Sequence, residues 1–154
     1  MTAMNENADL TEYVTFTLDG QIFGLPIGRV QEVFRPARIT RVPLAAAQIA
    51  GVLNLRGRIV TAIDMRSRLD LPPRGRAETA MAIGIESGSE SFGLLVDALG
   101  EVLKLSDAER EANPVNLDRK LARISAGVFR LDGQLLVVLD IDRVLDLFAE
   151  PAAA

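Results

Sequence analysis

Residues 23–34 of the chain read FGLPIGRVQEVF, and residues 92–103, which lie 69 positions later, read FGLLVDALGEVL. Phe, Gly, Leu, Glu and Val recur at matching positions, and three other positions exchange one apolar residue for another. A second repeat follows at an offset of 76, where LRGRIVTAID at residues 55–64 is answered by LDGQLLVVLD at residues 131–140. Two repeats in the same order indicate a duplicated unit rather than chance similarity between amphipathic segments.

The repeats divide the chain into two halves, from about residue 13 to 71 and from about residue 79 to 147. Between them, residues 72–78 contain two prolines and a glycine but no large apolar side chain, which is typical of a linker. We expect residues 13–148 to form the domain. The ends, residues 1–12 and 149–154, are expected to be tails.

Short strands separated by glycine turns make up most of each half. YVTFTL at residues 13–18 alternates apolar and polar side chains, and Asp19-Gly20 then supplies a two-residue turn into a partner strand. Similar hairpins are expected around residues 56–57, 87–89 and 132–133. The pattern predicts a mainly-β fold of small barrels or a sandwich. Because a barrel of about 60 residues has a thin core, the two units should share apolar surface.

Short helices are expected at four places. Pro26 followed by Ile27, Val30 and Val33 predicts a helix that ends before Pro36. Further helices are predicted after an Asp64 N-cap, after the capping-box pattern of residues 106–109, and over residues 141–148. Residues 39–42 are predicted to form a short strand.

The repeated apolar stripes are expected near the junction between the halves. They are Ile27, Val30 and Val33 in the first half and Val96, Leu99 and Val102 in the second. Two interpretations stay open, a core position or a groove for a partner. A core position is favoured for Val33, Phe34, Val102 and Leu103, whereas Ile27, Val30 and Leu99 are balanced between the two.

Composition excludes several kinds of chemistry. The chain has no cysteine and no histidine, which removes disulfides, thiolate nucleophiles, Cys/His zinc sites and Ser-His-Asp triads. None of these kinds of site is therefore expected. An alternative is carboxylate acid–base chemistry at Asp64 and Asp140, which recur at equivalent positions, but helix N-caps are the favoured interpretation.

Charge and hydropathy limit the possible partners. The net charge is −4 and the isoelectric point is about 4.9, which does not suit nucleic-acid binding. No apolar run approaches the ~20 residues needed to span a bilayer, so no membrane insertion is expected. Without a visible secretory signal, the expected location is the cytoplasm.

One segment carries a specific resemblance. GVLNLRGRIV at residues 51–60, closing with IDMR at residues 63–66, resembles the signature hairpin of CheW-type chemotaxis coupling proteins. The segments 14–16, 23–25, 30–33 and 93–97 are similar to the family in order and spacing, so that the resemblance extends from Tyr13 to Phe148.

The resemblance implies two SH3-like five-stranded barrels packed on a joint core, without catalytic activity or a cofactor. It implies a role in coupling the cytoplasmic tips of methyl-accepting chemoreceptors to the regulatory domain of a CheA-type histidine kinase. That role would recruit the chain to receptor arrays at the inner face of the membrane. An alternative is the same role in a non-flagellar pathway controlling pili, biofilm or gene expression.

The resemblance also implies two sets of binding residues. The receptor-binding set, in a groove between the barrels, is Val14, Ile27, Val30, Val33, Gly51, Arg56 and Leu99. The kinase-binding set is Glu32, Leu55, Arg56 and Gly57. A Glu32–Arg56 ion pair is expected, with a value for orientation rather than stability.

Overall fold

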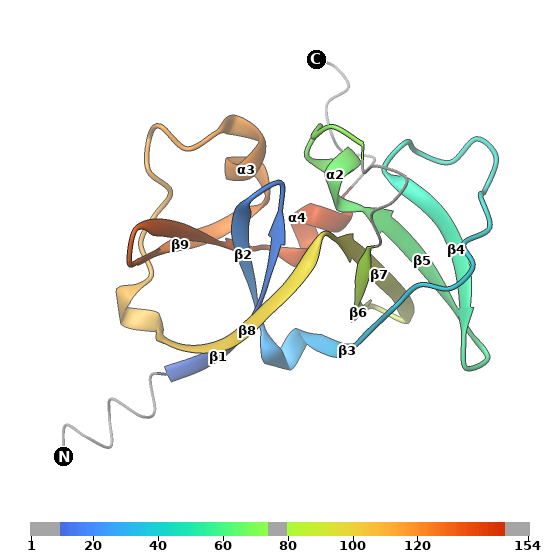
Figure 1. The fold of residues 1–154 in the computed structure, drawn as a ribbon, viewed down its shortest axis with the longest axis horizontal. Helices are drawn as coiled ribbons and strands as arrows, with labels where there is room; N and C mark the ends of the chain where they lie inside the picture. Colours follow the sequence, from blue (N-terminus) through green and yellow to red (C-terminus); the bar gives the residue numbers. More distant parts are fainter. Residues whose placement is uncertain (1–9, 74–79, 147–154) are drawn as a thin grey trace.

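Two five-stranded sheets and a few short helices make up the described part of the chain, residues 10–73 and 80–146 of the computed structural model (Figure 1). The first sheet has the order β8-β1-β2-β10-β9, and the second has the order β3-β6-β7-β5-β4. We call the bodies built on them the first lobe and the second lobe. The predicted fold class, mainly β with two five-stranded units and short helices, is confirmed.

The elements have the following bounds. The first sheet consists of β1 (Leu10–Leu18), β2 (Gln21–Pro26), β8 (Ala98–Ser106), β9 (Ser125–Leu131) and β10 (Gln134–Leu139). The second consists of β3 (Val30–Phe34), β4 (Ile49–Leu55), β5 (Arg58–Asp64), β6 (Met81–Ser87) and β7 (Glu90–Val96). The short helices are η1 (Ile27–Arg29), α2 (Met65–Arg68), η2 (Asp107–Glu109), α3 (Arg119–Ile124) and α4 (Ile141–Leu145).

The lobes do not coincide with the sequence halves, which corrects the expected subdomains at residues 13–71 and 79–147. Each sheet combines strands from both halves. The exchange follows from two short connections, since η1 alone joins β2 to β3 and Asp97 alone joins β7 to β8. Neither connection reverses the chain within a sheet, so each carries it across to the other sheet.

The expected tail and linker boundaries also change where the structure describes them. Strand β1 begins at Leu10, so residues 10–12 belong to the fold and not to a tail. Residues 1–9, most of the expected linker and residues 147–154 lie outside the described residues.

The strand registers repeat with the offsets of the sequence. Thr15 lies opposite Gly24 in the first sheet, and Gly84 lies opposite Gly93 in the second, both 69 positions later. In the parallel pairs, Ala62 faces Gly93 and Val138 faces Gly24, so that the offset of 76 holds as well. The two lobes are therefore built on the same plan.

The predicted helix after Pro26 is wrong beyond its first turn. Only Ile27–Arg29 is helical, as a 3₁₀ turn, and the chain continues as strand β3, antiparallel to β6. The β-branched Val30 and Val33 favour a strand, and pairing with β6 decides the outcome. A strand is also absent at residues 39–42, where Thr40 makes a single bridge to Val52.

The strand conformation overturns two expected core positions. Val33 and Val102 occupy equivalent places on β3 and β8 and are 44% and 50% exposed. Phe34 and Leu103 are half-buried, and they pack against apolar clusters inside the second and first lobe respectively. The stripes do lie at the junction as expected, because Val96 is fully buried in the joint core and Val30 and Leu99 pack against it.

A joint core connects the two lobes. Its buried side chains come from β1, β2, β9 and β10 of the first sheet and from β5, β6 and β7 of the second. Phe16 and Phe23 stack within it, with ring centroids 5.4 Å apart. Smaller clusters fill each lobe, and in the first lobe Tyr13 contacts Phe129 edge-on.

Two aspartates begin the helices that follow β5 and β10. The Asp64 carboxylate accepts hydrogen bonds from the backbone N–H groups of Arg66 and Ser67, and Asp140 accepts one from Arg143. The N-caps predicted at these two aspartates are confirmed, whereas the capping-box pattern of residues 106–109 yields only the 3₁₀ turn η2, in which the Ser106 side chain caps nothing. Replacement of Asp64 or Asp140 by alanine should lower the free energy of unfolding by about 1 kcal/mol each, measured by urea denaturation. Glu90→Ala, at an exposed carboxylate on β7, is the control and should stay within about 0.5 kcal/mol.

Tyr13 is the only tyrosine of the chain, which has no tryptophan, so ultraviolet absorbance of tyrosinate reports its ionisation directly. Burial, together with its hydrogen bond to the Asp107 carboxylate, raises the pKa of Tyr13. The stability that this group contributes is complete below the ordinary tyrosine pKa of about 10 and is lost as pH rises through the higher folded value. Tyr13→Phe should remove this alkaline loss. Ionisation of Tyr13 in the folded protein at its ordinary pKa would contradict the expectation.

Candidate functional site

An apolar surface lies where the chain crosses between the sheets. We call it the seam face, formed by Val14, Ile27, Val30, Val33 and Leu99, all expected in the receptor-binding set. Half-buried Val14 of β1 lies opposite Val102 of β8, and η1, which carries Ile27, packs against β1. Figure 1 shows η1 and β3 along the lower edge of the junction, next to the crossing β1 and β8.

The seam face combines anchored and exposed members. Val30 and Leu99 are held by the joint core, whereas Ile27 and Val33 are 42% and 44% exposed. Val102 adds a third exposed apolar side chain, which the sequence-based set omitted. Val102 is equivalent to Val33 at the repeat offset of 69, and this equivalence was the sequence signal for adding it to the set. Exposed apolar groups gathered in this way make the seam face a candidate interaction surface.

The β4–β5 hairpin forms a second candidate surface, which we call the hairpin face and which consists of Glu32, Leu55, Arg56 and Gly57. Both turn residues have positive φ, 54° at Arg56 and 84° at Gly57, as in a type I′ turn. The Asn54 side-chain oxygen accepts a hydrogen bond from the Gly57 N–H at 2.9 Å. This contact holds the turn, and the turn directs Arg56 away from the hairpin.

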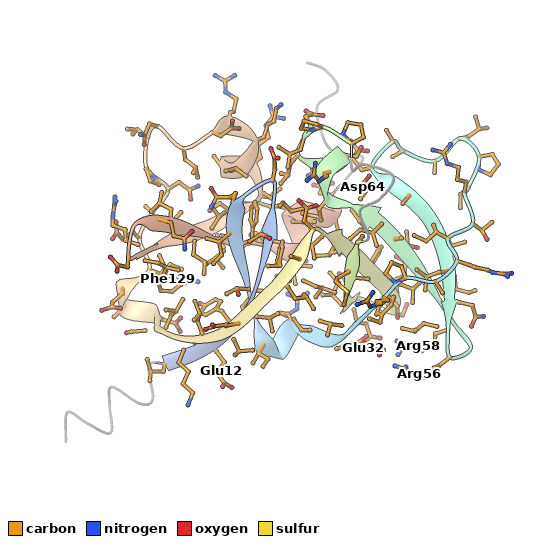
Figure 2. The ribbon with its side chains drawn as sticks, viewed as in Figure 1. Glu12, Glu32, Arg56, Arg58, Asp64 and Phe129 are labelled. Carbon is orange, nitrogen blue, oxygen red and sulfur yellow. The ribbon has the colours of Figure 1, made fainter. Side chains whose placement is uncertain are left out.

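Arg56 reaches from the hairpin to Glu32 on β3, and the expected ion pair is confirmed. In the sheet order, β3 and β4 are the two edges, so the pair links both edges of the second sheet. Figure 2 shows Glu32, Arg56 and Arg58 together at one corner of this lobe. Arg58 donates instead to the Ser91 hydroxyl at 2.7 Å, which leaves Arg56 as the partner of Glu32.

The two surfaces are separated by the alternation of strand β3. Glu32 and Val33 are consecutive in a strand, so their side chains point to opposite faces. Arg56, expected in both sets, lies with Glu32 in the hairpin face. Gly51 is buried, with φ of 148°, and a Cβ there would lie 2.3 Å from the Thr40 carbonyl oxygen. Its place in the fold is to let the β3–β4 connection approach β4.

A cleft of about 490 Å³ adjoins the hairpin face and was not anticipated from the sequence. Leu55 lines it together with Val52 and the exposed Ile59, and two arginines of the β3–β4 connection, Arg35 and Arg38, complete its wall. The alternation of β5 was the available signal, because buried Val60 predicts an outward Ile59. The cleft therefore adds an apolar area beside the charged hairpin face.

Among residues 10–73 and 80–146, no group of three or more acidic side chains is arranged to hold a metal ion. Within the same residues, no helix is long and apolar enough to cross a bilayer. The recurring carboxylates Asp64 and Asp140 are engaged as helix caps. The two candidate surfaces are thus an apolar one and a charged one, built on a common core.

Interleaved sheets with two exposed surfaces define a β-rich protein-interaction domain. The model of the CheW-like domain family matches residues 12–149, and the chain therefore belongs to this family.

Named relatives and a solved structure agree with this assignment. The chain is 27% identical to chemotaxis protein CheW of Thermotoga maritima over 88% of this chain and 87% of that protein. It is 29% identical to chemotaxis protein CheW of Rhizobium meliloti, with 86% of each protein covered. The crystal structure of the scaffolding protein TtCheW from Thermoanaerobacter tengcongensis superimposes with a TM-score of 0.75 at 29% identity, covering 84% of this chain and 88% of that one.

The Glu32–Arg56 pair is exposed, with 30% and 69% of the two side chains accessible. We therefore expect a double-mutant cycle with Glu32→Gln and Arg56→Gln to give a coupling energy below about 1 kcal/mol in chemical denaturation. Arg58→Gln on the same hairpin is the control and should show no coupling to Glu32→Gln. A coupling of several kcal/mol would mean that closure of the second sheet depends on this ion pair.

Proposed function

We propose that the chain is a non-catalytic adaptor that couples the cytoplasmic tips of chemoreceptors to the regulatory domain of a CheA-type histidine kinase. The observation that carries the proposal is the presence of two distinct surfaces, the seam face and the hairpin face, on opposite sides of strand β3. Its support also includes relatives named as chemotaxis proteins and a structural neighbour named as a scaffolding protein.

The seam face is assigned to the receptor. A receptor tip is a helical hairpin, and a helix docks by placing apolar side chains against an apolar surface. Ile27 and Val33 are accessible for such contact, while Val30 and Leu99 fix the surface to the joint core. Val14 and Val102, paired across β1 and β8, extend the surface into the first lobe.

The hairpin face is assigned to the kinase. The ion pair with Glu32 orients Arg56, and half-buried Leu55 lies between the turn and the cleft that Ile59 lines. A surface with an apolar floor and an oriented charge suits a specific protein contact, because the charge sets the register and the apolar area supplies affinity. The proposed function includes a location in the cytoplasm, at receptor arrays on the inner face of the membrane.

Two substitutions separate the receptor contact from the fold. Ile27→Asp and Val33→Asp each put a charge into the seam face at positions 42% and 44% exposed. A charge at such exposed positions should change the free energy of unfolding little. Because the apolar anchor is lost, the affinity for the receptor tip should weaken by about tenfold or more. Isothermal titration calorimetry with a receptor-tip helical hairpin measures the change, and circular dichroism checks the fold.

Val42→Asp is the matched control, since Val42 is 42% exposed but lies in the β3–β4 connection, outside the seam face. It should leave receptor binding unchanged. All three variants should retain affinity for the kinase regulatory domain. Undiminished receptor binding by folded Ile27→Asp and Val33→Asp proteins would refute the assignment of the seam face.

A further inference from the structure

Arg66 and Asp97 form a two-pronged ion pair at the junction of the lobes. Arg66 donates from Nε to Asp97 Oδ1 at 2.8 Å and from Nη2 to Asp97 Oδ2 at 2.6 Å. The two side chains are only 12% and 21% exposed, unlike the open pair of Glu32 and Arg56. Paired contacts of this geometry fix direction as well as distance.

The pair connects elements of both lobes. Arg66 lies on α2, which directly follows β5 of the second sheet, and its backbone N–H is bound by the Asp64 cap. Asp97 accepts a further hydrogen bond from the Asp19 N–H at 2.8 Å, in the β1–β2 turn of the first lobe. Its own N–H donates to the Thr17 carbonyl of β1 at 3.1 Å. Asp97 thus joins α2 of one lobe to the β1–β2 hairpin of the other.

Asp97 also stands at a crossing of the chain. It is the single residue between β7 of the second sheet and β8 of the first, and β8 carries the seam-face residue Leu99 together with Val102. At the equivalent crossing between β2 and β3 the repeat places Gly28, and the equivalent of Arg66 is Asp142. The Arg66–Asp97 ion pair is therefore present at the crossing between β7 and β8 and has no equivalent at the crossing between β2 and β3.

A second arginine secures α2 from the same helix. Arg68, which is 8% exposed, donates to the backbone carbonyls of Val144 at 3.0 Å and Arg143 at 2.9 Å, at the end of α4 in the first lobe. In Figure 1, α2 lies at the upper edge of the junction and η1 lies at the lower edge. A rotation of one lobe about the braced end would thus displace the seam-face elements at the far end.

We propose that Arg66 and Asp97 are positioning residues that fix the relative orientation of the two lobes and thereby the spacing of the seam face. The role in binding rests on the function proposed above, because the seam face is there assigned to a helical receptor tip. The residues lie outside both candidate surfaces, so they act on the partner through β8 and not by contact. Preorganisation of this kind raises affinity because the bound geometry is already present in the free protein.

The test of orientation uses Arg66→Gln and Asp97→Asn in the full chain, with residual dipolar couplings of backbone amides measured for each lobe. In both variants the first and second lobes should require a changed relative orientation, while each lobe retains its own structure. Arg130→Gln is the matched control, because its pair with Glu111 at 2.9 Å belongs to the first lobe alone. An unchanged relative orientation in folded Arg66→Gln protein would overturn the proposal. A further variant, Arg66→Lys, keeps the positive charge but cannot form the two-pronged contact of a guanidinium group. It should therefore give a change in orientation between those of the unmodified protein and Arg66→Gln.

The test of binding uses the same proteins, a receptor-tip helical hairpin and a kinase regulatory domain. The affinity for the receptor tip should fall about tenfold, while the affinity for the kinase domain, bound at the hairpin face, should stay within about twofold. Equal losses for both partners would count against positioning of the seam face. If the unmodified protein bound no receptor tip, the proposed function would fail, whereas the dipolar couplings would still decide whether the pair orients the lobes.

Discussion

The joint core is the constraint on which the rest of the structure depends. Neither half of the duplicated sequence completes a sheet alone, because each sheet takes strands from both halves. The connections through η1 and Asp97 carry the chain across, and Val30, Val96 and Leu99 are drawn into the core at these crossings. A lobe of about 60 residues has little core of its own, so the exchange lets two small units bury one larger apolar interior.

The duplication gives the two lobes the same sheet plan, and sequence differences between the two copies give them different candidate surfaces. Val33 and Val102 keep the apolar character of equivalent positions, and both become exposed at the seam. Glu32 pairs with Arg56, but the equivalents of these two residues are Glu101 and Asp132, two acids that have no attraction for one another. The hairpin of the second lobe is thus charged and braced in a way that the hairpin of the first lobe is not.

Local patterns predicted the hairpins and the caps because turns and N-caps depend on a few neighbouring residues. Asp64 and Asp140 were identified by the residue type that a helix start requires. The conformation of Val30–Phe34 could not be settled in this way, because its apolar spacing suits a helix while pairing with β6 makes it a strand. The strand exchange is likewise invisible to local patterns, since it depends on which distant edge each strand meets. The exposure of Val33 follows from the pairing with β6 and was missed with it, whereas the alternation of β5 offered a local signal for the exposed Ile59.

Placement of Glu32 and Val33 on successive positions of β3 explains how so small a domain presents two surfaces. A helix over the same residues would put the side chains of positions 32 and 33 about 100° apart around the helix axis. Two bulky partners bound to these side chains would then clash with one another. The strand sends them to opposite faces, so a helix docked on the seam face need not obstruct a partner at the hairpin face. The β-conformation of this short segment, fixed by β6 and the joint core, is therefore what would let the two proposed partners attach at the same time.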